Sequence, residues 1–192
     1  MAASPLAPRA DAAVVGLDSG SFLFVGGFAE AGRLRDSALY DPQANQWRAV
    51  ALLDTSVGSP FIEAIAATPS GAVAVVRWHE TDVLADAAND SLGVEVVEYD
   101  ESDSSWRSLG PAPADADDYL IDVDDEGVIV LGTRGALVTE GGSVRSASMA
   151  LFSSESGTAW DSVADASDLP ELQALRATPT TIVGTTFDHE LV

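Results

Sequence analysis

Four consecutive side chains of different chemistry stand together in the middle of the chain. Arg77, Trp78, His79 and Glu80 offer a cation, a flat stacking surface, a titratable ring and a carboxylate. We expect a long surface loop from Trp78 to residues 89–91, and Arg77 directly precedes it. This combination suits a sugar or a peptide as ligand. The alternative is that Trp78 packs against its neighbours and the group binds nothing.

A second candidate is the acidic segment from Asp122 to Gly127, in which Asp122 and Asp124 alternate with other residues before the glycine. A calcium loop of the alternating-acid type also needs a glutamate at its twelfth position, and Thr133 stands there. Aspartate and glycine are equally typical of a hairpin turn between two strands. We therefore predict a turn, and neither a metal site nor a cofactor.

The composition excludes several classes of chemistry. The chain has 192 residues and no cysteine, so it has no disulfide, no thiolate nucleophile and no zinc–thiolate site. Hydrophobic residues make up 46 %, which is enough to bury a core in one domain. No apolar run reaches the roughly 20 residues that span a bilayer. We see no signal peptide, so the expected location is the cytoplasm by default, or extracellular if a leader is missing.

The charge is strongly negative. The chain has 31 acidic residues and nine basic ones, all arginine, for a net charge of −22. Such a surface repels phosphate backbones, so we expect no nucleic acid as partner, and anionic membranes are disfavoured for the same reason. Two explanations stay open for this acidic protein: a coding bias that favours arginine over lysine, and adaptation to high salt.

A pair of aromatic residues recurs along the chain. Tyr40 and Trp47 are separated by six residues, and so are Tyr99 and Trp106. A third copy has Phe in place of Tyr and one more intervening residue, from Phe152 to Trp160. The tryptophans recur at 47, 106 and 160, at intervals of 59 and 54 residues, and a recurrence at such intervals indicates a structural repeat.

Each repeat contains four short, β-rich segments. The expected strands are residues 10–17, 20–25, 37–40 and 47–52, then 61–67, 71–76, 94–99 and 106–109, then 119–123, 127–131, 146–152 and 160–163. A further unit starts with residues 175–178 and 181–185, after a possible helical turn within 164–174. Four antiparallel strands per repeat predict an all-β fold, a partial β-propeller with blades at about 8–53, 60–110 and 117–164 and the start of a fourth at 173–192.

The first repeat resembles a Kelch repeat. Its second strand ends in the pair Gly26-Gly27, and Tyr40 and Trp47 follow at the spacing of that family. The resemblance implies a four-stranded propeller blade in which both aromatic residues pack between neighbouring blades. The later repeats depart from the pattern, because Arg77-Trp78 stand in place of the double glycine in the second.

The segment from Ser153 to Trp160 is similar to the Asp-box turn of sialidase-type propellers, with Glu155 in place of the aspartate. That turn is structural in the family. In sialidase-like enzymes arginines at the channel mouth grip a carboxylate, and Arg9 would open the innermost strand there. A cluster of three would need further members, drawn from Arg77, Arg134 and Arg176.

Three and a half blades do not close a ring, since propellers have roughly four to eight. We expect either missing blades of a longer chain or a homodimer that closes one ring. The favoured function is a non-catalytic scaffold that binds a protein or carbohydrate partner, because no acid, base and nucleophile constellation is recognisable. The alternative is a fragment of a carbohydrate-active propeller enzyme, sialidase-like or epimerase-like.

Overall fold

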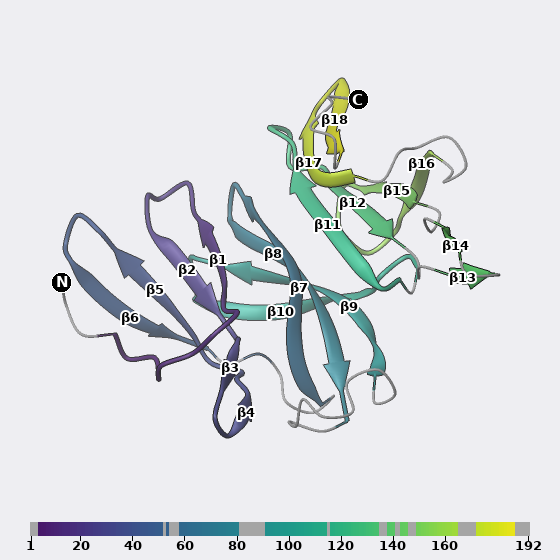
Figure 1. Ribbon diagram of the computed structural model, residues 1–192. Helices are drawn as coiled ribbons and strands as arrows, with labels where there is room; N and C mark the ends of the chain where they lie inside the picture. Colours follow the sequence, from purple (N-terminus) through teal and green to yellow (C-terminus); the bar gives the residue numbers. More distant parts are fainter. Residues whose placement is uncertain are drawn as a thin grey trace. The chain divides into compact units, whose positions relative to one another are not determined.

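The computed structural model describes residues 4–51, 53, 58–80, 91–114, 116–134, 138–140, 143–145, 149–164 and 172–186. All regular structure in these residues is β-strand (Figure 1), so no helix in them could cross a membrane. The chain divides into two compact units, Met1–Pro111 and Ala112–Val192, which are described separately.

The first unit contains two four-stranded antiparallel sheets. In each, the strands are hydrogen-bonded in chain order. The first sheet consists of β1 (Ala13–Gly16), β2 (Phe22–Val25), β5 (Ser37–Asp41) and β6 (Gln46–Val50). The second consists of β7 (Ser59–Thr68), β8 (Gly71–His79), β9 (Ser91–Asp100) and β10 (Ser105–Pro111).

The second unit repeats this pattern. Its four-stranded antiparallel sheet consists of β11 (Asp118–Val123), β12 (Ile129–Arg134), β15 (Met149–Ser154) and β16 (Asp161–Ala164). A two-stranded sheet follows, formed by β17 (Leu172–Thr178) and β18 (Thr181–Thr186). The predicted all-β class and the repeated four-stranded antiparallel sheets are therefore confirmed.

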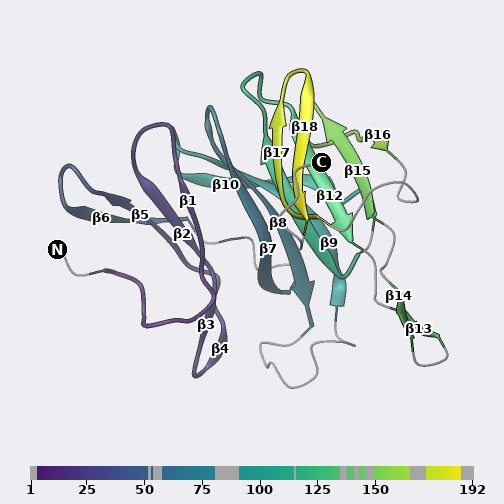
Figure 2. The same ribbon diagram turned by 45° about the horizontal axis from the view of Figure 1, so that its top comes forward.

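The structure also contains two small hairpins that the sequence analysis missed (Figure 2). One pairs β3 (Phe28–Ala29) with β4 (Gly32–Arg33), and the other pairs β13 (Val138–Glu140) with β14 (Ser143–Arg145). Each lies in the connection between the second and third strands of its sheet. Strands of two or three residues are too short to show a hydrophobic period. The predicted helical turn falls largely on residues 165–171, which lie outside the described part.

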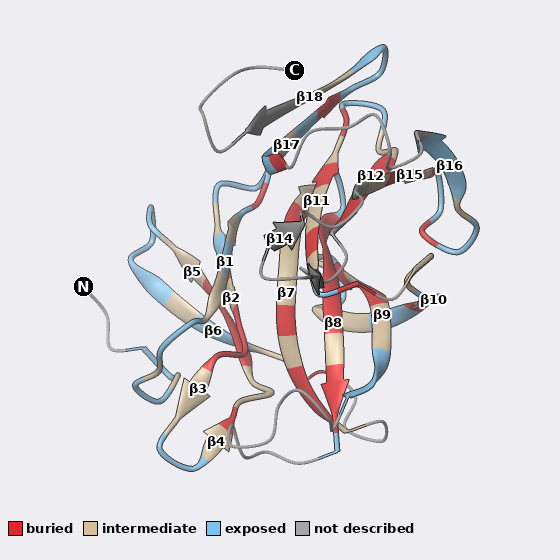
Figure 3. Cartoon of the chain, turned by 45° about the vertical axis from the view of Figure 1, so that its right-hand side comes forward, coloured by how far each residue is buried: buried red, intermediate tan, exposed pale blue. Residues whose placement is uncertain are grey.

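The core of the first unit lies between its two sheets. Successive side chains of a strand point to opposite faces, so Leu23 and Val25 of β2 point the same way and are fully buried. They belong to one cluster with Ala74 and Val76 of β8. Figure 3 shows that burial is most continuous along β8, whose residues 71–76 are all buried. A strand buried on both faces anchors its sheet, because each buried Val contributes about 1.5 kcal/mol or more.

The aromatic pairs occupy facing positions on the third and fourth strands. Tyr40 lies opposite Trp47 with ring centroids 4.9 Å apart, and Tyr99 lies opposite Trp106 at 5.2 Å. The third copy differs, because Phe152 lies opposite Ser162. The extra residue in that turn therefore displaces the third tryptophan from the facing position.

Trp106 also joins the two sheets of the first unit. Its indole Nε1 donates a hydrogen bond to the Ser37 hydroxyl of β5, 3.2 Å away, and this hydroxyl in turn donates to the Ala51 carbonyl at 2.9 Å. The turn that leads into β10 adds a second contact, from the Arg48 guanidinium to the Ser104 hydroxyl at 2.7 Å. The tryptophan of the second sheet thus packs on the first sheet.

The double glycine has a steric reason. Gly26 and Gly27 have positive φ angles of 61° and 93°. A Cβ atom on Gly27 would lie 2.5 Å from the Ala10 carbonyl oxygen and 3.0 Å from the Ala12 nitrogen, so the segment before β1 passes too close for any side chain. Ala10 and Phe28 exchange two backbone hydrogen bonds at this crossing, of 2.9 and 2.8 Å.

We expect Gly27→Ala to lower the free energy of unfolding by about 3 kcal/mol, because it adds a backbone clash to an unfavourable φ angle. Gly20 is the matched control: its φ is also positive, at 85°, and nothing lies within 4 Å of its Cβ position. Gly20→Ala should therefore cost only about 1 kcal/mol. Urea denaturation of both variants measures the difference, and equal losses would contradict the close approach at Gly27.

Candidate functional site

The segment that carries the four predicted ligand-binding residues is mostly strand. Strand β8 continues through His79, so the expectation of a loop is wrong for Trp78 and His79. Trp78 and His79 are each 3 % exposed, whereas Glu80 is exposed. Because faces alternate along a strand, Arg77 and His79 point to one face and Trp78 to the other. The structure does not bring the four side chains together on one surface.

Arg77 and Trp78 both have partners inside the protein. Arg77 Nε lies 2.5 Å from Glu63 Oε1, and the two side chains are only 14 % and 9 % exposed. The Trp78 indole donates to Glu95 Oε2 at 3.0 Å. A buried charge pair is costly to separate, so Arg77 is poorly placed to exchange Glu63 for a ligand. Trp78 packs against its neighbours, as the alternative interpretation of this segment expected. Ligand binding by Arg77, Trp78, His79 and Glu80 stays a prediction.

Arg9 is also held by a carboxylate. Its guanidinium donates to both carboxylate oxygens of Asp36, at 2.8 and 2.7 Å, and to the Gly26 carbonyl at 2.8 Å. The Arg9 side chain is 8 % exposed. These bonds tie the segment before β1 to both ends of the connection between β2 and β5. The hydrogen bond from Arg9 and its charge hold the pKa of Asp36 below the ordinary value, against the opposing effect of burial.

The other candidate arginines lie in the second unit. Arg176 is 74 % exposed at its side chain and lies 3.6 Å from Asp122. The side chain of Arg134 lies outside the described residues. Arg9 and Arg77 are each engaged by a carboxylate of the first unit, so neither guanidinium could grip an external carboxylate without giving up part of that pairing.

The acidic segment forms the predicted hairpin turn between β11 and β12. Asp124 Oδ1 accepts hydrogen bonds from the backbone nitrogens of Glu126 and Val128, at 2.9 and 2.8 Å. Asp122 Oδ2 accepts from the Ala177 nitrogen of β17 at 2.6 Å. The carboxylates therefore shape a turn and join two strands. Within the described part of the chain, no three potential metal ligands gather in one place.

The turn that resembles an Asp-box is organised by a hydroxyl. Ser154 Oγ accepts from the Gly157 nitrogen at 2.8 Å and donates to the Ala159 carbonyl at 2.5 Å. Glu155, which stands in place of the aspartate, is exposed. The hydroxyl of Ser154 therefore holds this turn together.

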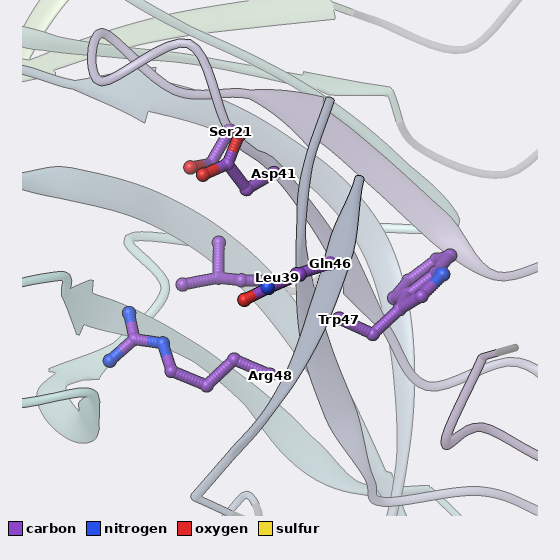
Figure 4. A pocket seen from close by; sticks show the side chains of 6 residues that line it. All are labelled: Ser21, Leu39, Asp41, Gln46, Trp47 and Arg48. Atoms are coloured by element: carbon purple, nitrogen blue, oxygen red, sulfur yellow. The ribbon is translucent and has the colours of Figure 1, made fainter. Parts of the chain in front are cut away.

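A pocket of about 230 Å³ lies over the first sheet, at residues that were not predicted as a site from the sequence. Six residues from the turn before β2 and from β5 and β6 line it: Ser21, Leu39, Asp41, Gln46, Trp47 and Arg48. Figure 4 shows the oxygens of Ser21 and Asp41 close together, Leu39 and Arg48 directed to the same side, and the Trp47 ring directed the other way. The pocket lining therefore includes a hydroxyl, a carboxylate, an amide and a guanidinium, together with Leu39, which is only 4 % exposed.

Strand register explains how these residues meet. Leu39 pairs with Arg48 and Asp41 pairs with Gln46, because Tyr40 pairs with Trp47 between them. Two of the polar groups are fixed by other bonds: Arg48 by the Ser104 hydroxyl, and Asp41 Oδ1 by the Gln43 nitrogen at 2.8 Å. The spacing of the aromatic pair was the signal in the sequence that could have predicted this arrangement.

Comparison with known proteins does not identify a family for this chain. The chain matches no protein-family model, and no curated protein is significantly similar to it. The function must therefore be inferred from the residues themselves.

The lowered pKa of Asp36 predicts a pH dependence of stability. Because the folded value lies below the ordinary 3.8, the carboxylate contributes stability at pH above that value and loses it as the pH falls through the folded pKa. We expect the free energy of unfolding of wild type to exceed that of Asp36→Asn at neutral pH. This gap should close as the pH falls below about 4.

Urea denaturation of both proteins between about pH 2 and 7 measures the gap. The same substitution in an Arg9→Met background provides the control, since the partner is then absent and the gap should be small at every pH. A gap that is as large at the acidic end as at neutral pH would contradict the ion pair with Arg9.

Proposed function

We propose that the chain is a non-catalytic scaffold of Kelch-like propeller blades that binds a glycan in the pocket of the first sheet. The single observation that carries the proposal is the pocket lining, which includes Ser21, Asp41, Gln46 and Arg48. Hydroxyl, carboxylate, amide and guanidinium groups bind the hydroxyls of a sugar through hydrogen bonds.

The arrangement of neighbouring sheets supports the propeller part of the proposal. In the first unit β1 of one sheet lies beside β7 of the next, and in the second unit β11 lies beside β17. Each of these is the first strand of its sheet. Adjacent first strands are what innermost strands of neighbouring blades require, because blades pack around a central channel.

The size of the pocket limits the ligand. A volume of about 230 Å³ is below the ~300–1,000 Å³ of sites for drug-sized ligands. One sugar ring at the end of a chain is therefore the expected occupant. The guanidinium of Arg48 is already held by Ser104, so little side-chain freedom is lost when a ligand binds.

The pocket lining favours binding over hydrolysis. Most glycosidases use two carboxyl groups, about 5–10 Å apart, on either side of the bond that is cleaved. Asp41 is the one carboxylate among the six lining residues. The arginines expected of a sialidase-like site are engaged by Asp36 and Glu63, which supports the non-catalytic function over the enzyme alternative.

A glycan array tests the proposal. We expect the chain to retain a subset of glycans, and Arg48→Met to weaken that binding about tenfold or more, because one charge-assisted hydrogen bond contributes about 1.5–3 kcal/mol. Arg107→Met is the matched control, since Arg107 of β10 is 68 % exposed and does not line the pocket. It should bind as wild type does.

Two results would count against the proposal. Absence of binding to glycans ending in either neutral or acidic sugars would remove the glycan as ligand. Turnover of a fluorogenic sialoside that Arg48→Met abolishes would show an enzyme in place of a scaffold.

A further inference from the structure

Arg48, on the wall of the pocket, forms no ion pair with the residues that the structure describes. Its hydrogen bond there runs from Nη1 to a neutral group, the Ser104 hydroxyl, at 2.7 Å. Other arginines of the chain do pair with carboxylates, among them Arg9, Arg77, Arg107 and Arg176. In a chain with 31 acidic residues, an exposed arginine that lines a pocket without a carboxylate partner keeps its charge available for a ligand.

The hydrogen bond to Ser104 leaves one edge of the Arg48 guanidinium open. It uses Nη1, so Nε and Nη2 have no hydrogen-bond partner in the described part of the chain. These two nitrogens direct their hydrogens in parallel and form the fork that a carboxylate fills with both oxygens. Because Ser104 already orders the side chain, the fork is in place before a ligand arrives.

The pocket carries the opposite charge at its other end. Figure 4 shows the oxygens of Ser21 and Asp41 on one side of Leu39 and the Arg48 guanidinium on the other. Asp41 Oδ1 accepts hydrogen bonds from two backbone nitrogens of the turn that follows, at 2.8 and 3.0 Å. Its Oδ2 has no partner among the described residues, so this oxygen can accept the hydroxyl hydrogens of a sugar.

Strand register sets the separation of the two charges. Leu39 lies opposite Arg48, and Asp41 follows two residues later on the same face of β5. Asp41 and Arg48 are therefore diagonal neighbours, whose Cα atoms lie about 7–8 Å apart. The two side chains do not pair with each other. A single sugar ring can lie between them, with an anionic group at Arg48 and hydroxyls at Asp41.

We propose that the sugar bound in this pocket is a uronic acid, whose carboxylate pairs with the Arg48 guanidinium and whose hydroxyls donate to Asp41. The inference rests on the proposed function, since it specifies the sugar that the pocket holds. A neutral sugar would leave the charge of Arg48 without a counter-charge. The net charge of −22 opposes an anion only weakly, because physiological salt screens charges beyond about 8 Å and the guanidinium in contact decides.

NMR titration of the whole chain with methyl glycosides, at neutral pH and about 150 mM NaCl, tests the proposal. The glucuronide and the galacturonide differ from the glucoside and the galactoside only by a carboxylate in place of a CH₂OH group. We expect the acid of at least one pair to bind about tenfold tighter or more than its neutral counterpart, because it gains a charge-assisted bidentate pair. The methyl ester of that acid has no charge and should bind as the neutral sugar does.

Variants assign the preference to one side chain. Arg48→Met should remove it, so that the acid and the neutral sugar bind alike, and Arg48→Gln provides a second variant, should the first fail to fold by circular dichroism. Asp41→Asn is the matched control, because it removes the other charge of the pocket. It should weaken both sugars and keep the preference for the acid.

The results separate this inference from the proposed function. Binding of a neutral sugar as tight as that of its acid overturns the uronic acid and leaves the glycan scaffold standing. A preference that survives both Arg48 variants overturns the pairing with Arg48. Absence of binding to all four sugars overturns the uronic acid too, and the glycan array then decides on the scaffold independently.

Discussion

The contact between the two sheets of the first unit is the interaction on which the rest of that unit depends. A small sheet exposes two faces, and an apolar face is stable only when another surface covers it. Here the inner residues of β2 and β5 meet those of β8 and β9 in one buried cluster. The hydrogen bond from Trp106 to Ser37 lies in this contact and fixes how the two sheets align. The pocket depends on it too, because Ser104 of the second sheet holds Arg48.

Two of the arginines place their positive charge inside the protein, each beside a carboxylate. Arg9 joins the segment before β1 to the connection after β2, and Arg77 pairs with Glu63 across two strands. Both side chains are nearly buried, and each satisfies a carboxylate that would otherwise be costly to desolvate. In a chain with nine arginines and 31 acidic residues, a buried arginine with a carboxylate partner is therefore poor grounds for inferring a catalytic cation.

Much of the fold could be predicted from local sequence, because strands of four to ten residues with apolar alternation are a local property. The aromatic spacing gave the hairpins of the first two sheets correctly, with Tyr40 opposite Trp47 and Tyr99 opposite Trp106. The spacing did not predict the pairing in the hairpin of the third sheet, where one added residue places Phe152 opposite Ser162. A repeat found by spacing alone does not reveal such a shift of register.

The roles of the candidate site residues were harder to predict, because each charged side chain has its partner far along the chain. Trp78 and His79 look like loop residues after the apolar run before them, yet β8 includes both. The charge of Arg77 has its partner in Glu63, which lies 14 residues earlier and meets it across the sheet. Arg9 likewise meets Asp36 from 27 residues away. The composition of a segment does not show whether its charges are paired.

The hydrogen bond between Trp106 and Ser37 has a consequence for how the protein forms. It joins residues 69 apart in the chain, whereas the strand pairs within each four-stranded sheet join near neighbours. Closing a long loop costs entropy before any contact forms, so hairpins appear early and the docking of one sheet on the next appears late. During synthesis the first sheet is complete many residues before Trp106 leaves the ribosome. Until then its inner apolar face has no cover, and this interval is when the nascent chain is most exposed to aggregation.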